Sequence, residues 1–200
     1  MRVLAIALAL ALGGCATGYS LAPAGQMRAV AGSALTVTPS REWNRLGSLA
    51  GPGRDAELWT LDGPQLNELT FYGGIRDGRP LFREVDRRDR PLPRFSATML
   101  ASDVPALLES SYRVAAGTPL FEMGTVVPAT LAGAAGVRFD YGYVLPGDEV
   151  RRRGEAVAAI VGGQLFMVTF EAPAIHYFER DLPEARRVMA SARLTSRPSG

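Results

Sequence analysis

Two apolar segments joined by a pair of glycines constrain the fold more than any other feature of the sequence. Residues 156–161 (AVAAIV) and 165–170 (LFMVTF) are apolar at both odd and even positions, and they flank Gly162-Gly163. Two adjacent glycines favour a tight β-hairpin, because both turn residues can take positive φ at little steric cost. Strands that are apolar on both faces need cover on both faces. The hairpin is therefore predicted inside a layered domain.

The remaining pattern predicts more strands, with one helix between them in the sequence. Alternating or β-branched segments bounded by turn residues predict strands at 35–38, 57–61, 66–75, 120–127 and 136–144. Pro105 and Gly117 bound a helix whose apolar residues recur at helical spacing. Residues 76–94, rich in Arg, Asp, Gly and Pro, predict a long exposed loop.

The C-terminal region predicts two further helical pieces. A helical turn is expected at 174–179, followed by a separate helix from Leu182 that Asp181 caps, with Glu184 completing a capping box. The elements add up to the α+β class, with a mainly antiparallel sheet flanked by helices as an α/β/α sandwich.

The N-terminus has the pattern of a secretory signal. Arg2 supplies the positive charge, and residues 3–12 form an uninterrupted apolar run. A run of this length is too short for a membrane-spanning helix, which needs about 20 residues, but it suits a signal peptide. Small residues then lead to Cys15, which is the only cysteine of the chain. The single thiol excludes disulfides and makes thiolate metal ligands and thiol catalysis implausible.

The segment Leu12-Gly13-Gly14-Cys15 resembles the lipobox of bacterial lipoprotein signals. The resemblance implies that Cys15 receives diacylglycerol, becomes the first mature residue after removal of 1–14, and is acylated on its amine. Ala16 after the cysteine implies sorting to the periplasmic face of the outer membrane. An ordinary secretory signal with a coincidental cysteine, or an uncleaved anchor, is the alternative. Residues 15–33 are expected to form a flexible tether, 34–195 a single domain and 196–200 a disordered tail.

The charge composition argues against a nucleic-acid-binding protein. The formal charge of +2 falls to +1 when the signal, which contains Arg2, is removed. All 22 basic residues are arginine, which reflects a GC-rich genome more simply than a functional selection. A nucleic-acid partner would require a concentrated basic face.

The second half of the chain resembles the PsbP-like superfamily, which includes the Mog, PsbP and DcrB branches. The resemblance rests on a strand ending in Phe139-Asp-Tyr-Gly-Tyr143, an arginine-rich strand at 151–155, the Gly-Gly hairpin, and a terminal helix through 187–192. It extends over residues 35–194. It implies an α/β/α sandwich around an antiparallel sheet and a non-enzymatic accessory or binding role, with no shared catalytic residues to transfer.

Little in the sequence supports catalysis. His176 is the only histidine and could act as a general base with Glu171 or Glu179, but a partly buried histidine near a helix start is the simpler interpretation. There is no Gly-x-Ser-x-Gly motif, and the absence of lysine excludes Ser–Lys chemistry. One histidine and no free cysteine make a zinc site improbable. We therefore expect no catalytic, metal-binding or cofactor-binding residues.

Arg151, Arg152 and Arg153 form the densest basic segment and predict an interaction patch for anionic head groups or an acidic partner. The alternative is an edge-strand segment kept soluble by charge. Three functions follow, in decreasing order of support. The first is an envelope accessory lipoprotein that binds a protein through a sheet edge or the 76–94 loop. The second is a binder of a small ligand or lipid, in a pocket lined by Tyr141, Tyr143, Phe166 and Phe170. The third is an envelope hydrolase that uses His176.

Overall fold

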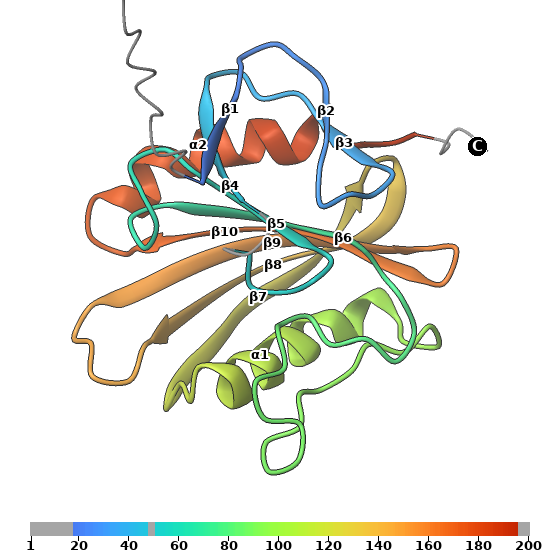
Figure 1. Cartoon of the computed structure of the whole chain (residues 1–200), viewed down its shortest axis with the longest axis vertical. Helices are drawn as coiled ribbons and strands as arrows, with labels where there is room; N and C mark the ends of the chain where they lie inside the picture. The colour runs from blue at the N-terminus through green and yellow to red at the C-terminus, as the bar shows by residue number, and fades with distance from the viewer. Residues whose placement is uncertain (1–17, 48–50, 196–200) are drawn as a thin grey trace, which may run out of the picture.

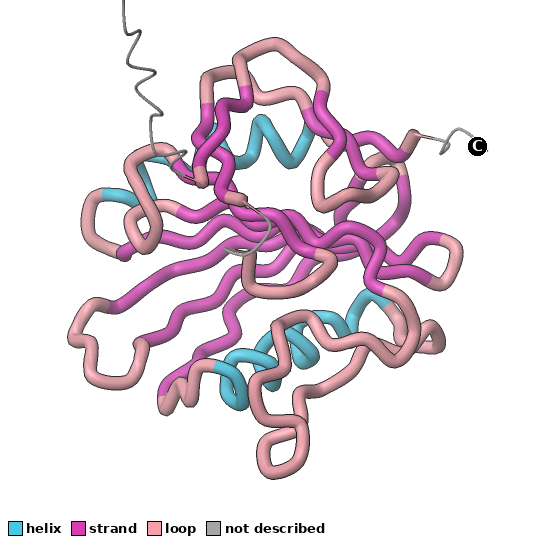
Figure 2. Tube along the Cα trace, in the orientation of Figure 1, coloured by secondary structure: helices cyan, strands magenta, loops and turns pink. Residues whose placement is uncertain are grey.

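The computed structural model describes residues 18–47 and 51–195 and contains two antiparallel sheets and two α-helices (Figures 1 and 2). The main sheet has eight strands in the order β1-β4-β5-β6-β10-β9-β8-β7. Its strands are β1 (Tyr19–Ala22), β4 (Trp43–Leu46), β5 (Ala56–Thr60), β6 (Glu68–Ile75), β7 (Leu120–Leu131), β8 (Ala134–Val144), β9 (Arg151–Val161) and β10 (Gln164–Pro173). The small sheet has the order β11-β3-β2, from β2 (Arg28–Ala29), β3 (Leu35–Val37) and β11 (Arg193–Leu194).

Two layers cover the two faces of the main sheet (Figure 1). Helix α2 (Tyr177–Ala190) and the small sheet cover one face, where Trp43 and Trp59 are buried. A 3₁₀ turn (Ala101–Asp103), helix α1 (Val104–Ala115) and residues 76–100 cover the other face. The predicted α+β class and α/β/α arrangement are confirmed.

The Gly-Gly hairpin is confirmed at the centre of this arrangement. Gly162 and Gly163 take φ values of 57° and 71°, and Val161 pairs with Gln164 across the turn. The two strands that they join, β9 and β10, are buried along most of their length. Residues 76–94 form a loop, as predicted. The expected exposure of the loop is wrong in part, because its own residues Leu81 and Leu92 are buried.

The expected flexible tether at 15–33 extends too far. β1 pairs with β4 at the edge of the main sheet, β2 pairs with β3, and Ala22 is fully buried. The folded domain therefore includes residues from Tyr19 onward. These strands are short and rich in small residues, so non-local pairing and not local pattern defines them. The predicted signal at 1–14, Cys15 and the tail at 196–200 lie outside the described residues.

The two expected C-terminal helical pieces form one helix. α2 continues from Tyr177 to Ala190 through Pro183, whose ring nitrogen leaves one backbone hydrogen bond unmade. Packing of the buried face, including Leu182 and Val188, outweighs that loss. Asp181 is therefore not a cap. It lies inside the helix, 3% exposed. Among the residues that the structure describes, no helix is both long and apolar enough to cross a bilayer.

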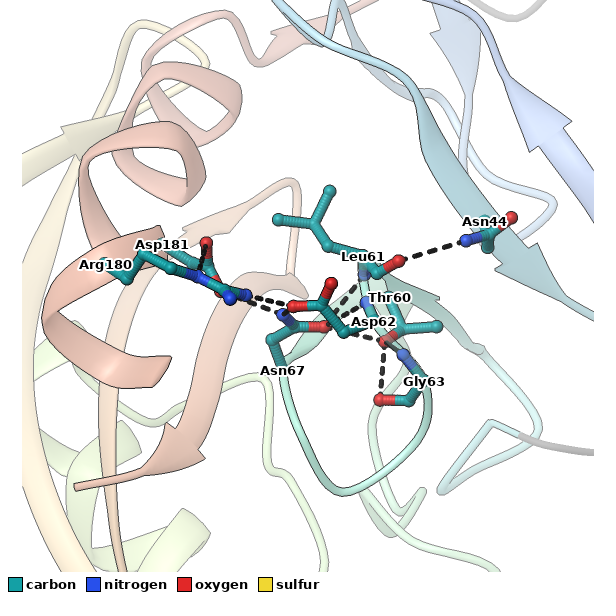
Figure 3. A network of polar contacts seen from close by, with 8 residues as sticks. All are labelled: Asn44, Thr60, Leu61, Asp62, Gly63, Asn67, Arg180 and Asp181. Carbon is teal, nitrogen blue, oxygen red and sulfur yellow. Dashed lines mark hydrogen bonds and ion pairs between the residues drawn. The ribbon is translucent and has the colours of Figure 1, made fainter. Parts of the chain in front are cut away.

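A buried polar network joins the first turns of α2 to the β5–β6 turn (Figure 3). Asn67 is fully buried, and its side-chain amide donates to the carboxylates of Asp62 and Asp181 at 2.8 Å each. Its carbonyl accepts the backbone N–H groups of Leu61 and Asp62 at 2.9 Å. Arg180 bridges the same two carboxylates. The network thus fixes where α2 begins over the sheet.

Candidate functional site

The arginine run at 151–153 starts β9, and strand alternation divides it between the two faces of the sheet. Arg152 is cross-strand from Tyr143, belongs to the α1 side and is only 4% exposed. Arg151 and Arg153 lie on the α2 side, where both are exposed. The expectation of one patch made of three arginines is therefore wrong, because successive side chains of a strand point to opposite faces.

The two exposed arginines are paired with acids. Arg151 forms an ion pair with Glu122 of β7, and Arg153 forms one with Glu179 of α2. The Arg153 guanidinium also lies 4.3 Å from the centre of the Phe178 ring. Because each cation has its own carboxylate, this surface has little net positive charge to attract an anionic head group.

Exposed apolar side chains lie at the same end of the sheet as the paired arginines. Leu120, Val150 and Ile175 are 45%, 41% and 84% exposed. They lie at one end of the sheet, since Leu120 pairs with Val144, Val144 pairs with Arg151, and the Ala174 N–H donates to the Arg151 carbonyl at 2.8 Å. We call Leu120, Glu122, Val150, Arg151, Arg153 and Ile175 the sheet-end surface. It combines exposed apolar groups with charges that are already neutralised.

Strand β7 extends this surface along the edge of the main sheet. It has 12 residues and is the last strand in the sheet order, so only β8 pairs with it among the described strands. Pro128 and a bulge between Met123 and Val126 interrupt its regular pattern, and Thr125 N–H donates to Asp140 at 3.0 Å within the bulge. Such devices limit indiscriminate edge pairing. The Arg113 guanidinium also donates to the Phe121 carbonyl at 3.2 Å, so a partner strand could pair with this edge only away from the bulge and Phe121.

A buried carboxylate lies beneath this end of the sheet, on the α1 side. Glu171 of β10 is 5% exposed and accepts hydrogen bonds from the hydroxyls of Tyr112, Tyr141 and Tyr143. The Tyr143 hydroxyl is 3.0 Å from Oε2, and the other two hydroxyls share Oε1. Tyr112 comes from α1 and the other two from β8, so one carboxylate joins the helix to two strands of the sheet. We call these four residues the tyrosine–glutamate cluster.

A glycine makes the cluster possible. Gly154 of β9 pairs with Tyr141 on one side and with Glu171 on the other. A Cβ at residue 154 would lie 2.2 Å from Cζ of Tyr141. Without that Cβ, the Tyr141 ring can lie across β9 and reach the carboxylate on the next strand.

Burial dominates the electrostatics of the cluster. It raises the pKa of Glu171 above that of an ordinary glutamate, and the three hydroxyls offset this only in part. Burial and the nearby Glu171 charge raise the pKa of each cluster tyrosine well above 10. Arg152 lies beside Tyr143, and its Nε is buried without a hydrogen-bond partner. The phenols stay protonated and act as donors.

The histidine and the expected aromatic pocket are not organised for catalysis or ligand binding. His176 is exposed, not partly buried as expected, and its ring packs edge-on against Tyr177 at 5.3 Å. Its two suggested partners are engaged elsewhere, Glu171 by tyrosines and Glu179 by Arg153. Nothing in the described residues groups three or more metal-ligating side chains.

The pocket predicted between Tyr141, Tyr143, Phe166 and Phe170 is wrong. The tyrosines belong to the α1-side core and the phenylalanines to the α2-side core, so the sheet separates them. Two open, polar grooves lie elsewhere on the described part of the chain. One of about 330 Å³ lies between residues 31–34 and 73–76, and one of about 520 Å³ is lined by Arg54, Asp55, Arg76, Asp77 and Arg79.

Sequence reasoning did not identify the cluster, although part of its signal was visible. Glu171 follows a run of apolar strand residues, and Tyr141 and Tyr143 share one face of β8. The proximity of Glu171 to Tyr112, which lies 59 residues earlier in the chain, depends on the strand order of the sheet.

No protein-family model matches the chain, and no curated protein sequence matches it. Among solved structures, the chain is similar to the cyanobacterial PsbP protein (CyanoP) of Synechocystis sp. PCC 6803, with a TM-score of 0.55 and 15% identity over 92% of this chain and 96% of that chain. This similarity supports a PsbP-like fold and, at that identity, the fold alone.

Two weaker similarities carry no argument. PA94 of Pseudomonas aeruginosa, a protein of unknown function described as a putative regulator, has a TM-score of 0.44 and 17% identity over 72% of this chain and 83% of that chain. LpqN of Mycobacterium tuberculosis, described as involved in cell envelope biogenesis, has a TM-score of 0.31 and 12% identity over 89% and 92% of the two chains.

Proposed function

We propose that the protein is a non-enzymatic accessory protein of the bacterial cell envelope, anchored by lipid on Cys15, that binds a protein partner through the sheet-end surface and β7. The observation that carries the proposal is the cluster of exposed Leu120, Val150 and Ile175 beside the 12-residue edge strand. Ile175 is the most exposed of the three.

The chemistry of this surface suits a protein partner better than an anion. Contiguous exposed apolar groups with a polar rim are typical of protein-binding surfaces. Arg151 and Arg153 already have carboxylate partners. Both can therefore contact a partner at the rim of the surface without the cost of desolvating an unpaired cation. The unpaired edge of β7 can add backbone hydrogen bonds to an extended segment of a partner.

Two observations favour binding over catalysis. The side chain of His176 is at the surface, and the two acids that could have oriented it bond to other residues. The space between the sheet and α1 is filled by packed aromatic rings such as Phe121 and Tyr141. Neither arrangement places an activated side chain beside a substrate pocket.

The proposed location rests on the N-terminal sequence. The lipobox-like Leu12-Gly13-Gly14-Cys15 is the basis for the anchor, and Ala16 favours the periplasmic face of the outer membrane over the inner membrane. A lipid-anchored protein needs no spanning helix.

Site-specific photocrosslinking in living cells tests the binding surface. A photoreactive phenylalanine at Leu120, Val126 or Ile175 should crosslink the same protein, and one at Val85 should not. Val85 is 95% exposed but belongs to the loop on the α1 side, so it controls for non-specific capture. Ile175→Asp should reduce the Leu120 crosslink. Equal products from all four positions, or none under any growth condition, would contradict the proposal.

A further inference from the structure

We infer that the outer face of β1 rests on the bilayer that holds the anchor, so that the domain lies on the membrane in a fixed orientation. The occupant proposed for this face is an anionic phospholipid surface. The inference rests on the lipid anchor of the proposed function and adds how the domain is presented.

The segment of chain between the proposed anchor and the folded domain is short. Cys15 and Tyr19 are four residues apart. A fully extended chain covers at most about 3.3–3.6 Å per residue, so the start of β1 can be no more than about 14 Å from the lipidated residue. β1 is held in the main sheet through its pairing with β4. The sheet edge therefore cannot move far from the bilayer surface.

The β1 edge of the sheet exposes large apolar and aromatic side chains. Tyr19 and Leu21 are 48% and 52% exposed and lie on the same face of β1. They point away from the α2-side core, because the alternate residue Ala22 is fully buried in it. Met27, 65% exposed, follows in the connection to β2. Tyrosine is enriched at membrane–water interfaces, and apolar side chains of surface-bound proteins enter about 5–10 Å into the headgroup boundary.

The charged residues near the anchor are all basic. No acidic residue precedes Glu42, and Arg28 and Arg41 are the only charged residues between 16 and 41. Residues 16–41 thus carry two positive charges and no negative charge. Negatively charged lipids attract such a segment and would repel an acidic one.

The orientation has a consequence for the proposed binding surface. β1 and β7 are the two opposite edges of the eight-stranded sheet. Seven strand spacings of about 4.8 Å separate them by at most about 34 Å. With Tyr19 and Leu21 on the bilayer, β7 lies up to that distance from the contact, measured across the sheet. α1 and residues 76–100 lie across the sheet from α2 and the β1–β2 connection (Figure 1).

Fluorescence quenching on the full-length, lipidated protein tests this orientation. Lipidation consumes the only native cysteine, so Leu21→Cys provides a single site for an NBD fluorophore. Val126→Cys on β7 is the matched control, since Val126 is also on an edge strand and 43% exposed. Vesicles of phosphatidylethanolamine and phosphatidylglycerol should contain a lipid with a shallow nitroxide quencher. We expect quenching at residue 21 to exceed that at residue 126 by at least about threefold, with blue-shifted emission only at residue 21.

The outcomes separate the inference from the anchor on which it rests. Intact-mass measurement of the same sample reports whether Cys15 carries lipid. An unlipidated protein would refute the proposed anchor. A lipidated protein with equal quenching at both positions would refute the membrane-facing edge alone. Rapid disulfide formation between unlabelled Leu21→Cys molecules, with no quenching, would show that a second copy covers β1 and would also overturn the inference. Adding Tyr19→Ser to the Leu21→Cys protein should lower the quenching by about half.

Discussion

The two helices are attached to opposite faces of the same sheet by buried carboxylates, but with different chemistry. For α1 the sheet supplies the acid, Glu171, and the helix supplies a neutral donor, Tyr112. For α2 the helix supplies the acid, Asp181, whose partners are an amide and the guanidinium of Arg180 (Figure 3). One attachment is a neutral-donor network in a dry aromatic core. The other is an ionic network at the rim.

This difference decides how each attachment responds to its surroundings. Burial leaves the pKa of Glu171 raised, because phenols only partly compensate for the lost water. Burial alone would also raise the pKa of Glu184 in α2, but hydrogen bonds from Ser40 and Arg187 outweigh it and lower the pKa. The α1 side should therefore respond mainly to steric and hydrogen-bonding changes, and the α2 side to changes of charge.

The largest effect is expected when the shared acceptor is removed. Glu171→Leu leaves three buried hydroxyls without their acceptor and should lower the free energy of unfolding by about 3–4 kcal/mol. Glu171→Gln keeps an oxygen acceptor and should cost about 1 kcal/mol or less. Urea unfolding followed by circular dichroism measures both. If Glu171→Leu is as stable as Glu171→Gln, the hydroxyls need no acceptor, and the cluster stabilises the fold through apolar packing alone.

The next largest effect tests the glycine that lets Tyr141 cross β9. Gly154→Ala should cost about 2–3 kcal/mol, because its Cβ would overlap the tyrosine ring. Gly142→Ala is the matched control, as the nearest atom to a Cβ there is 3.4 Å away. In a double-mutant cycle, Tyr141→Ala should remove most of the Gly154→Ala penalty. Additive costs would contradict the steric explanation.

A moderate effect is expected on the α2 side. Arg186 bonds to Glu155, with Nε 2.8 Å from Oε1, and that glutamate is 5% exposed. Arg186→Ala leaves the buried Glu155 carboxylate without its partner and should lower the free energy of unfolding by about 1–2 kcal/mol. Arg151→Ala breaks an exposed pair and should cost about 0–1 kcal/mol. Thermal unfolding at low and high salt measures both. Equal costs would mean that burial of the acid does not matter here.

The smallest expected effect is a pH dependence that separates the two sides. Folded Glu171 keeps its proton to a higher pH than it does in the unfolded chain, so the native state binds more protons in that window. The free energy of unfolding should therefore fall as pH rises from the ordinary glutamate pKa through the raised one. Glu171→Gln should lack this fall.

The acids with lowered pKa values act in the opposite direction. The pKa of Asp62 and of Glu184 is lowered, so their stabilising contribution is lost as pH falls below the ordinary carboxyl range. Both groups are present in the native protein and in Glu171→Gln, so their contribution cancels in the difference between the two pH profiles. A flat difference would show that Glu171 titrates alike in the folded and unfolded chain.

The parts of the fold that could be predicted are those with a local cause. The Gly-Gly hairpin and α1 between Pro105 and Gly117 follow from turn chemistry and periodicity. β1 could not be predicted, because its residues become a strand through pairing with β4. The sequence predicts two helical pieces in place of α2, because Asp181 and Glu184 match a capping box when the packing beneath them is unknown.

The candidate site shows the same limit. Strand alternation alone would have separated Arg152 from its two neighbours once 151–153 was assigned to a strand. Pairing of Arg153 with Glu179, 26 residues later, depends on how β10 and α2 fold back over β9. The apolar group of Leu120, Val150 and Ile175 likewise exists only because four strands end together.

The tyrosine–glutamate cluster also fixes an order of events. α1 ends at Ala115, and its Tyr112 must wait for an acceptor 59 residues further along the chain. During synthesis or export the helix emerges before β8, β9 and β10 exist to receive it. Its polar anchor can form only when β10 has paired with β9 and Tyr141 has settled over Gly154. The α1 side therefore cannot complete its polar attachment to the sheet until Glu171 has been made, and until then the aromatic face of α1 lacks its cover.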